Sequence, residues 1–142
     1  MREISEVFVN GISLERVLES QGKWLNNEGG KRANLMGVDL SDVDLNNVNL
    51  RGANLTDAIL RHANLTDADL SGSDLELADL SGADLTSAIL RSSNLNSSVL
   101  IGTDLTGADL SYSDLNGVDL RTAILIDSKL IGVDLSGVKL ND

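Results

Sequence analysis

Leucine occupies every fifth position from Leu35 to Leu140 without a break, which gives 22 leucines in a row. The position two residues before each leucine always holds a small side chain: Ala, Val, Ser or Thr. The position just before the leucine is Asp or Asn in sixteen repeats, and the second position after it is Gly in nine. This uninterrupted period of five restricts the possible folds more than any other feature of the chain.

A five-residue period fits neither regular secondary structure. Five residues turn an α-helix by about 500°, so successive leucines would spiral around it and form no face. On a flat strand, side chains alternate between two faces, so every second leucine would point outward. A chain that buries all of these leucines must therefore bend once per repeat. We predict a three-residue extended side ending at each leucine, then a two-residue corner. The second corner residue favours Gly or Asn, because a type II turn needs a positive φ there.

Such bent segments stack into coils that pair as parallel strands about 4.8 Å apart. Leucines and small residues then fill the interior and leave no room for a ligand cavity. The Ser and Thr residues at the inward position need backbone carbonyls as hydrogen-bond acceptors. Disorder is the competing interpretation for a chain rich in Asp, Asn, Ser and Gly, but disordered chains lack regularly spaced apolar residues.

The repeat has the form A-[DN]-L-x-x, as in Ala33-Asn34-Leu35, Ala68-Asp69-Leu70 and Ala108-Asp109-Leu110. It resembles the pentapeptide-repeat family, and the resemblance extends over residues 33–142. The resemblance implies an all-β solenoid, a right-handed quadrilateral parallel β-helix with four pentads per coil. The 22 pentads then make about five and a half coils. We expect two parts, an N-terminal cap in residues 1–32 and the β-helix in residues 33–142.

The first 32 residues break the repeat and predict a cap with one helix. Ser13 is a suitable N-cap, with Ile12 and Val17 placed as a hydrophobic staple around it. Apolar residues then recur at helical spacing, which predicts a helix over about residues 14–25 and a linker after it. This helix is expected to cover the first coil, whose backbone groups would otherwise stay unpaired.

Other features of the first 32 residues predict how the end of the β-helix is closed. The segment Ile4 to Val9 is expected to form a short strand, with Asn10-Gly11 as a turn. Phe8 and Trp24 are expected to plug the end of the column. The stretch from Trp24 to Leu35 also resembles leader segments of bacterial and phage-borne pentapeptide-repeat proteins.

Composition excludes several classes of function. The chain has no Cys, which rules out disulfides, a thiolate nucleophile and a Cys-zinc site. Its formal charge is −11, which argues against direct binding of nucleic acid or an anionic membrane. No signal peptide or long apolar run is present. We therefore expect a soluble, acidic, cytoplasmic protein with no cofactor and no metal site.

The charge is predicted to lie on two opposite sides of the coil. Residues 1–32 carry five acidic and five basic side chains, so the repeats hold the whole excess. With four pentads per coil, one side sums to −5 and the opposite side also to −5. The first side carries Asp44, Asp67, Asp84, Asp104 and Asp127, and the second carries Asp57, Asp74, Glu76, Asp114 and Asp134. Stacked carboxylates raise each other's pKa or attract a cation, unless they only accept hydrogen bonds from turn amides.

Aliphatic residues replace polar ones at outward positions near the end of the repeats. They are Val99, Ile101, Ile124, Ile126 and Ile131. No aromatic plug follows the last leucine, so the final coil is expected to be uncapped. Together these features suggest a contact surface for a second copy of the chain or for another protein.

Three function classes remain open, and an enzyme is not among them, because the sequence offers no nucleophile–base pair and no phosphate-binding loop. The first is a rigid, non-catalytic protein–protein interaction module. The second is an acidic DNA mimic, since the resemblance implies that some family members bind a type II topoisomerase such as gyrase. This chain differs from that subgroup in having no Phe at the central position, no loop between coils and no C-terminal helix. The third is a structural rod that carries a partner-binding leader.

Overall fold

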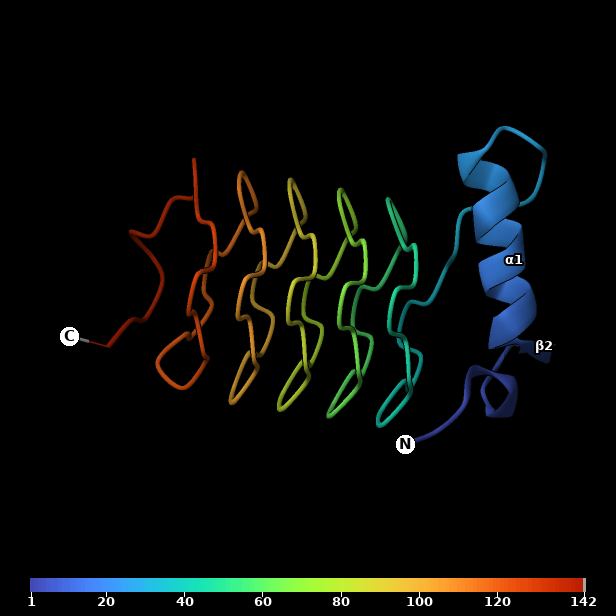
Figure 1. Cartoon of the computed structure of the whole chain (residues 1–142), viewed down its shortest axis with the longest axis horizontal. Helices are drawn as coiled ribbons and strands as arrows, with labels where there is room; N and C mark the ends of the chain where they lie inside the picture. The colour runs from blue at the N-terminus through green and yellow to red at the C-terminus, as the bar shows by residue number, and fades with distance from the viewer. Residues whose placement is uncertain (142) are drawn as a thin grey trace.

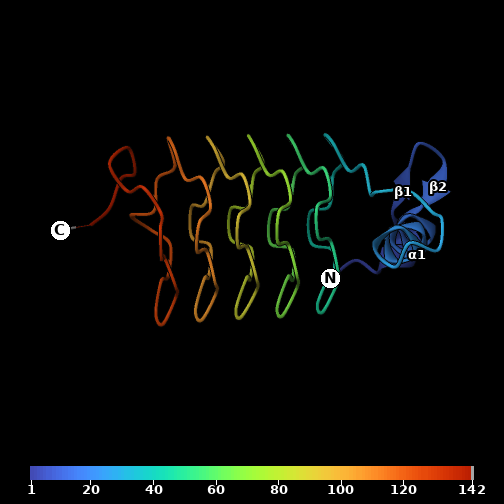
Figure 2. The same ribbon diagram turned by 90° about the horizontal axis from the view of Figure 1, so that it is seen from above.

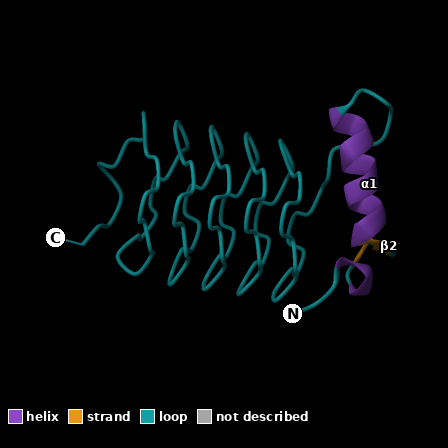
Figure 3. Ribbon diagram, viewed as in Figure 1, coloured by secondary structure: helices purple, strands orange, loops and turns teal. Residues whose placement is uncertain are grey.

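A computed structural model describes residues 1–141 as a stack of coils closed at one end by a small cap (Figures 1 and 2). The cap contains the 3₁₀ turn η1 (Ile4–Glu6), strands β1 (Phe8–Val9) and β2 (Ile12–Ser13), and helix α1 (Leu14–Leu25). The repeats carry no helix or named strand and are drawn as loops in Figure 3. Each straight side is too short for more than one ladder residue.

Consecutive coils are joined by parallel bridges between residues twenty positions apart. Examples are Asn54 with Asp74 and Asp84 with Asp104. Four pentads therefore complete one turn, and the coil has four sides. We name them A, B, C and D after their first leucines, Leu35, Leu40, Leu45 and Leu50 respectively. Most leucine amides donate to the next coil, as Leu45 N–H does to the Asn64 carbonyl at 2.7 Å.

The corners have the geometry predicted from the repeat. The amide three residues after each leucine donates back to the leucine carbonyl, as from Val38 to Leu35 at 3.1 Å. The second corner residue has positive φ in nineteen of the twenty-one corners from Gly37 to Gly137. At only a few of these corners does close packing exclude any side chain larger than that of glycine. A Cβ at Gly82 would overlap the His62 ring of the preceding coil.

Leucine fills the interior along most of the stack. The eighteen leucines from Leu35 to Leu120 are buried, with at most 3% of their surface exposed. The inward hydroxyls of Ser93, Ser113 and Thr103 donate to backbone carbonyls, as predicted. Those of Ser73 and Ser98 have no partner within the described residues. The expectation that all 22 leucines are buried is wrong for the last four, of which Leu140 is 42% exposed.

The last coil departs from the regular stack, and Figure 1 shows it in red, opening away from its neighbour. Thr122 occupies a corner position that needs positive φ, which a β-branched residue resists, and it does not adopt it. Its Oγ1 accepts the Gly102 amide at 3.1 Å, in place of the backbone acceptor used in the regular coils. Within the described residues, Asp114 and Asp134 do not form the bridge that the regular stack would give them.

The cap contains the predicted helix. Helix α1 spans Leu14–Leu25, and the Ser13 hydroxyl accepts the Arg16 amide at 3.3 Å as its N-cap. Asn10 and Gly11 both have positive φ, 51° and 81°, as a two-residue type I′ hairpin turn between β1 and β2 requires. The strand expected from Ile4 to Val9 is wrong in its first half, where the chain forms η1 instead.

The predicted aromatic plug is also wrong. Phe8 is 62% exposed and Trp24 is 39% exposed. Val7 and Val9 point to the opposite face of the hairpin segment from Phe8 and are buried with Leu14 against the first coil. Aliphatic side chains, and not aromatic ones, therefore close the column.

Gln21 supplies the polar part of this closure. Its side chain is fully buried on the face of α1 that covers the first coil. It donates from Nε2 to the Arg51 carbonyl at 2.8 Å and accepts the Ala33 amide at Oε1 at 2.7 Å. On side C, the backbone of Arg2 pairs with the first coil and accepts the Asp44 amide at 2.9 Å. These contacts satisfy backbone groups that the edge of a β-stack would otherwise leave unpaired.

Replacing Gln21 with leucine should therefore destabilise the whole chain. The change leaves one buried amide and one carbonyl without a partner, which we expect to lower the free energy of unfolding by about 2 kcal/mol. Urea unfolding followed by circular dichroism measures this. The exposed neighbour Lys23, changed to leucine, is the matched control and should shift stability by no more than about 0.5 kcal/mol. Equal effects of the two variants would contradict the role given to Gln21.

Candidate protein-interaction surfaces

The outward Asp and Asn residues before each leucine have a common structural task. In all sixteen repeats that carry one, its side-chain oxygen accepts the backbone amide two residues later. Asp84 accepts the Thr86 amide at 2.9 Å, and Asn94 accepts the Asn96 amide at 3.0 Å. This Asx turn holds the corner that follows the leucine. The sixteen amides belong to Met36, Ser41, Asn46, Arg51, Thr56, Thr66, Ser71, Glu76, Ser81, Thr86, Asn96, Thr106, Ser111, Asn116, Arg121 and Ser136.

These hydrogen bonds lower carboxyl pKa values. The hydrogen bond from the Thr106 hydroxyl, followed by that from its amide, lowers the pKa of Asp104. The Asn46 side chain and amide do the same for the pKa of Asp44. The possibility that stacking raises the pKa of such carboxyls is therefore wrong for Asp104, although it forms a bridge with Asp84. The turn hydrogen bonds outweigh the desolvation that would raise the pKa of Asp104.

Arginines neutralise carboxylates on sides B and D only. Arg91 pairs with Asp109 at 3.0 Å on side D, and Arg61 pairs with Asp79 on side B. Arg51 and Arg121 form the other two ion pairs, with Asp69 on side D and Asp119 on side B. No acidic residue of side A or C has an ion-pair partner within residues 1–141.

The bridges bring some of the predicted acidic residues into rows along sides C and A. Asp44, Asp84 and Asp104 follow one another along side C, interrupted by Asn64. Asp74 and Asp114 lie on side A, again with an asparagine between them. Asp134 follows Asp114 in sequence but not as a bridge partner, because the last coil is displaced there. The remaining four acids lie at corners: Asp57 and Glu76 beside side A, and Asp67 and Asp127 beside side C.

The five predicted aliphatic contact residues are exposed but do not share one side. Their exposed fractions run from 37% for Val99 to 63% for Ile126. Val99 bridges Asp79 on side B, whereas Ile124 bridges Asp104 on side C. Ile101 and Ile126 lie at the corners that follow these two residues, and Ile131 lies at the corner after side D. They therefore lie around the end of the stack and do not form one flat patch.

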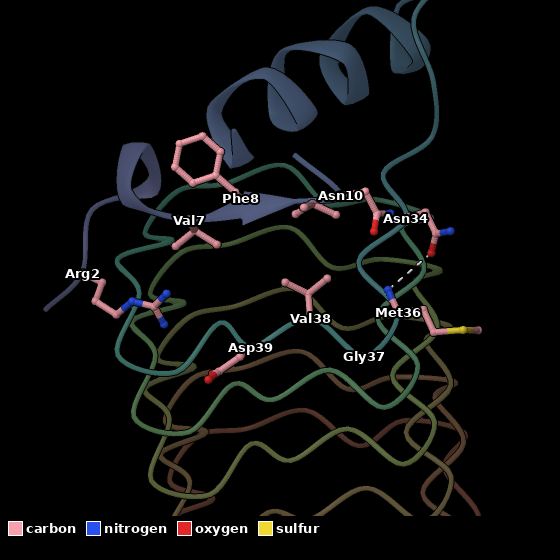
Figure 4. A pocket seen from close by; sticks show the side chains of 10 residues that line it. Arg2, Val7, Phe8, Asn10, Asn34, Met36, Gly37, Val38 and Asp39 are labelled. Carbon is pink, nitrogen blue, oxygen red and sulfur yellow. Dashed lines mark hydrogen bonds between the residues drawn. The ribbon is translucent and has the colours of Figure 1, made fainter. Parts of the chain in front are cut away.

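The larger cavities lie on the cap or beside the last coil, not inside the stack. One of about 440 Å³ lies between β1 and the first coil, bordered by Arg2, Phe8, Val38 and Asp39 (Figure 4). Another, of about 320 Å³, lies between Asp114 and Asp134, where the last coil opens.

Within the described part of the chain, no three His, Cys, Asp or Glu side chains gather as metal ligands. No helix among residues 1–141 has the length and apolar character needed to cross a membrane.

The sequence matches the profile of pentapeptide repeats, with eight copies over residues 33–72, 63–100, 78–115 and 103–142. The chain belongs to the pentapeptide-repeat family. A comparison with curated proteins gives no match.

Two cyanobacterial pentapeptide-repeat proteins of known structure resemble this chain. Rfr23 from Cyanothece 51142 superposes with a TM-score of 0.67 and 24% identity, covering 91% of this chain and 100% of that one. The alr5209 protein from Nostoc PCC 7120 has a TM-score of 0.64 and 33% identity, covering 89% and 94%. Such proteins form right-handed quadrilateral β-helices, the fold class predicted from the repeat. QnrB1, a plasmid-mediated fluoroquinolone resistance protein, has a TM-score of 0.36, which supports no argument about function.

Acid should weaken the rod through its Asx turns. The nearby Ser111 hydroxyl, the Ser111 amide, which donates to Asp109 at 3.0 Å, and the Arg91 guanidinium together lower the pKa of Asp109 from 3.8 to about 2. A lowered folded-state pKa means that the stabilisation is complete above about pH 4 and is lost as pH falls toward 2. We expect Asp109→Ala to lower the free energy of unfolding by about 1 kcal/mol at pH 6. At pH 2.5 this deficit should be clearly smaller, as measured by urea unfolding.

Asn49→Ala is the matched control for Asp109→Ala, because Asn49 lies on the same side D. It removes the same kind of turn acceptor, but the asparagine side chain does not titrate. Its deficit should therefore be the same at both pH values. If the two variants respond to acid alike, the carboxyl of Asp109 does not stabilise the fold through its charge.

Proposed function

We propose that this pentapeptide-repeat chain is a rigid, non-catalytic interaction module that contacts protein partners through its last coils. The observation that carries the proposal is the change of residue type at one column of corners. Thr66 and Thr106 in this column donate their hydroxyls to Asx oxygens at 2.6 Å. Ile126, in the last position of the column, gives up that hydrogen bond and is 63% exposed. Exposed aliphatic side chains gathered in one region are typical of a contact surface.

The filled interior supports a role without catalysis. The leucine column leaves no enclosed space for a substrate, and an enzyme needs a concave site from which water is excluded. The Asp side chains directly before the leucines are already engaged by turn amides. A flat, rigid wall of this kind suits recognition by another protein surface.

A second copy of the chain is the partner that we favour for the last coil. Leu125, Leu130 and Leu135 are only half-buried there, in contrast to the fully buried leucines of the preceding coils. Ile126 and Ile131 surround these leucines with further apolar surface. Face-to-face association of two such ends, related by a two-fold axis, would cover both sets at once.

Ile126→Asp and Ile131→Asp should each weaken this association. A carboxylate placed in an apolar contact loses its hydration, so we expect the dimer dissociation constant to rise at least tenfold. Size-exclusion chromatography with light scattering over a concentration series measures it. Ile89→Asp is the matched control, because Ile89 is exposed on side D far from the last coil.

A strict monomer at every concentration would contradict the homodimer. The proposal of an interaction module would also be contradicted if neither isoleucine variant changed the set of proteins retained in a pull-down from the source cell.

A second candidate function is mimicry of DNA toward a type II topoisomerase. It is favoured by the two opposed sides on which no carboxylate is neutralised. Five acids on side C over five coils of about 4.8 Å give one negative charge per roughly 4.8 Å. A DNA strand carries one per about 3.4 Å. The lower charge density places this function second.

A gyrase supercoiling assay tests the mimicry directly. If sides A and C imitate phosphate rows, micromolar protein should inhibit or modulate supercoiling. A variant with Asp57, Asp67 and Asp127 changed to Asn should act at least several-fold more weakly, because three negative charges are lost and the turns remain. No effect of the unmodified protein would exclude this function.

A further inference from the structure

Three cations border one groove on the cap of this otherwise acidic chain. Arg16 of α1 and the linker residues Lys31 and Arg32 line a groove of about 270 Å³. Apolar side chains of Val9, from β1, and Val17, from α1, form another part of its wall, and most of its lining is apolar. No acidic residue lines it, although the chain has a formal charge of −11.

The fold holds the linker cations in place. Gly30 packs against α1 so closely that a Cβ there would lie 2.8 Å from the Lys23 Cβ. The Lys31 amide then donates to the Ser20 hydroxyl at 2.8 Å. Arg32 donates from Nε to the Gly52 carbonyl, which leaves its two outer nitrogens unengaged within the described residues. The backbone of Lys31 and the guanidinium of Arg32 are therefore held by the fold before any ligand arrives.

The three cations are not neutralised within the protein. All four ion pairs of the described residues involve other arginines. Glu15 and Glu19 flank Arg16 along α1, but neither comes within 4.0 Å of it as an ion-pair partner. Arg16, Lys31 and Arg32 are all exposed, so their charges are accessible to an anion that enters the groove.

We propose that this groove binds a small organic anion with an apolar chain, of the medium-chain carboxylate class. The carboxylate would lie among Arg16, Lys31 and Arg32, and the chain would cover Val9, Ile12 and Val17. The volume is slightly below the roughly 300–1,000 Å³ of pockets for drug-sized ligands, so a short ligand fits it. The acidic sides of the rod repel anions, which leaves this groove as the cationic site for one.

Octanoate, below its micellar concentration, is the probe, and isothermal titration calorimetry on the full chain is the measurement. We expect saturable binding that weakens with added salt. Acetate, which lacks the chain, and octanol, which lacks the charge, should each bind at least tenfold more weakly. Lys31→Ala should weaken octanoate binding roughly tenfold, because one charge-assisted contact is lost.

Lys23→Ala is the matched control, since Lys23 also lies on the cap but does not line this groove. It should leave the affinity for octanoate unchanged, and both variants should keep the thermal unfolding temperature of the parent chain. Three results would overturn the proposal: no binding of octanoate at millimolar concentration, equal binding of octanoate and octanol, or equal loss of affinity in the Lys31 and Lys23 variants.

Discussion

The structure depends on burying one leucine in every five residues. That period forces the chain to turn after each leucine, and each turn exposes an amide and requires a positive φ. The Asp or Asn before the leucine satisfies the amide through its side-chain oxygen, as at Asp84 and Asn94. The corners therefore favour Asp or Asn directly before each leucine. Asn accepts the turn amide as well as Asp does, so the turn alone does not determine whether the position carries a charge.

The placement of arginine decides where the resulting charge remains. An arginine at the first corner position of sides B and D reaches the aspartate of the next coil, as Arg61 reaches Asp79 and Arg91 reaches Asp109. The corresponding corner positions of sides A and C carry no arginine. One repeat thus produces two kinds of side, with and without ion pairs, which alternate around the rod. A partner that approaches side A or C meets uncompensated carboxylates, and one that approaches side B or D meets ion pairs.

The regular part of this fold could be predicted because a single period encodes it. The corners and the α1 helix follow from the spacing of residues, whereas the assignment of residues to sides also needed the four pentads per coil that the family resemblance implied. The closure of the first coil was predicted less well, because hydrophobicity suggested Phe8 and Trp24 as the plug. The alternation Val7-Phe8-Val9 already indicates that Phe8 faces away from its neighbours.

Gln21 falls on the apolar face of the helix, seven residues after Leu14. A buried polar side chain at such a position indicates unpaired backbone groups nearby. The last coil opens next to Thr122, a β-branched residue at a corner that does not adopt the positive φ of the regular corners.

The corner acids are the part of the surface that the architecture does not explain. The turn amides need an acceptor at Asp44, Asp84 and Asp104. Asp57 and Asp67 lie at corners and accept no turn amide. Both adopt a positive φ, which Gly adopts at a lower energetic cost in other corners. Substituting Asn at such a corner keeps both its size and its tolerance of positive φ, and removes only the charge. The fold therefore does not require these acids, and Asp57, Asp67 and Asp127 lie beside the two sides that the arginines leave uncompensated.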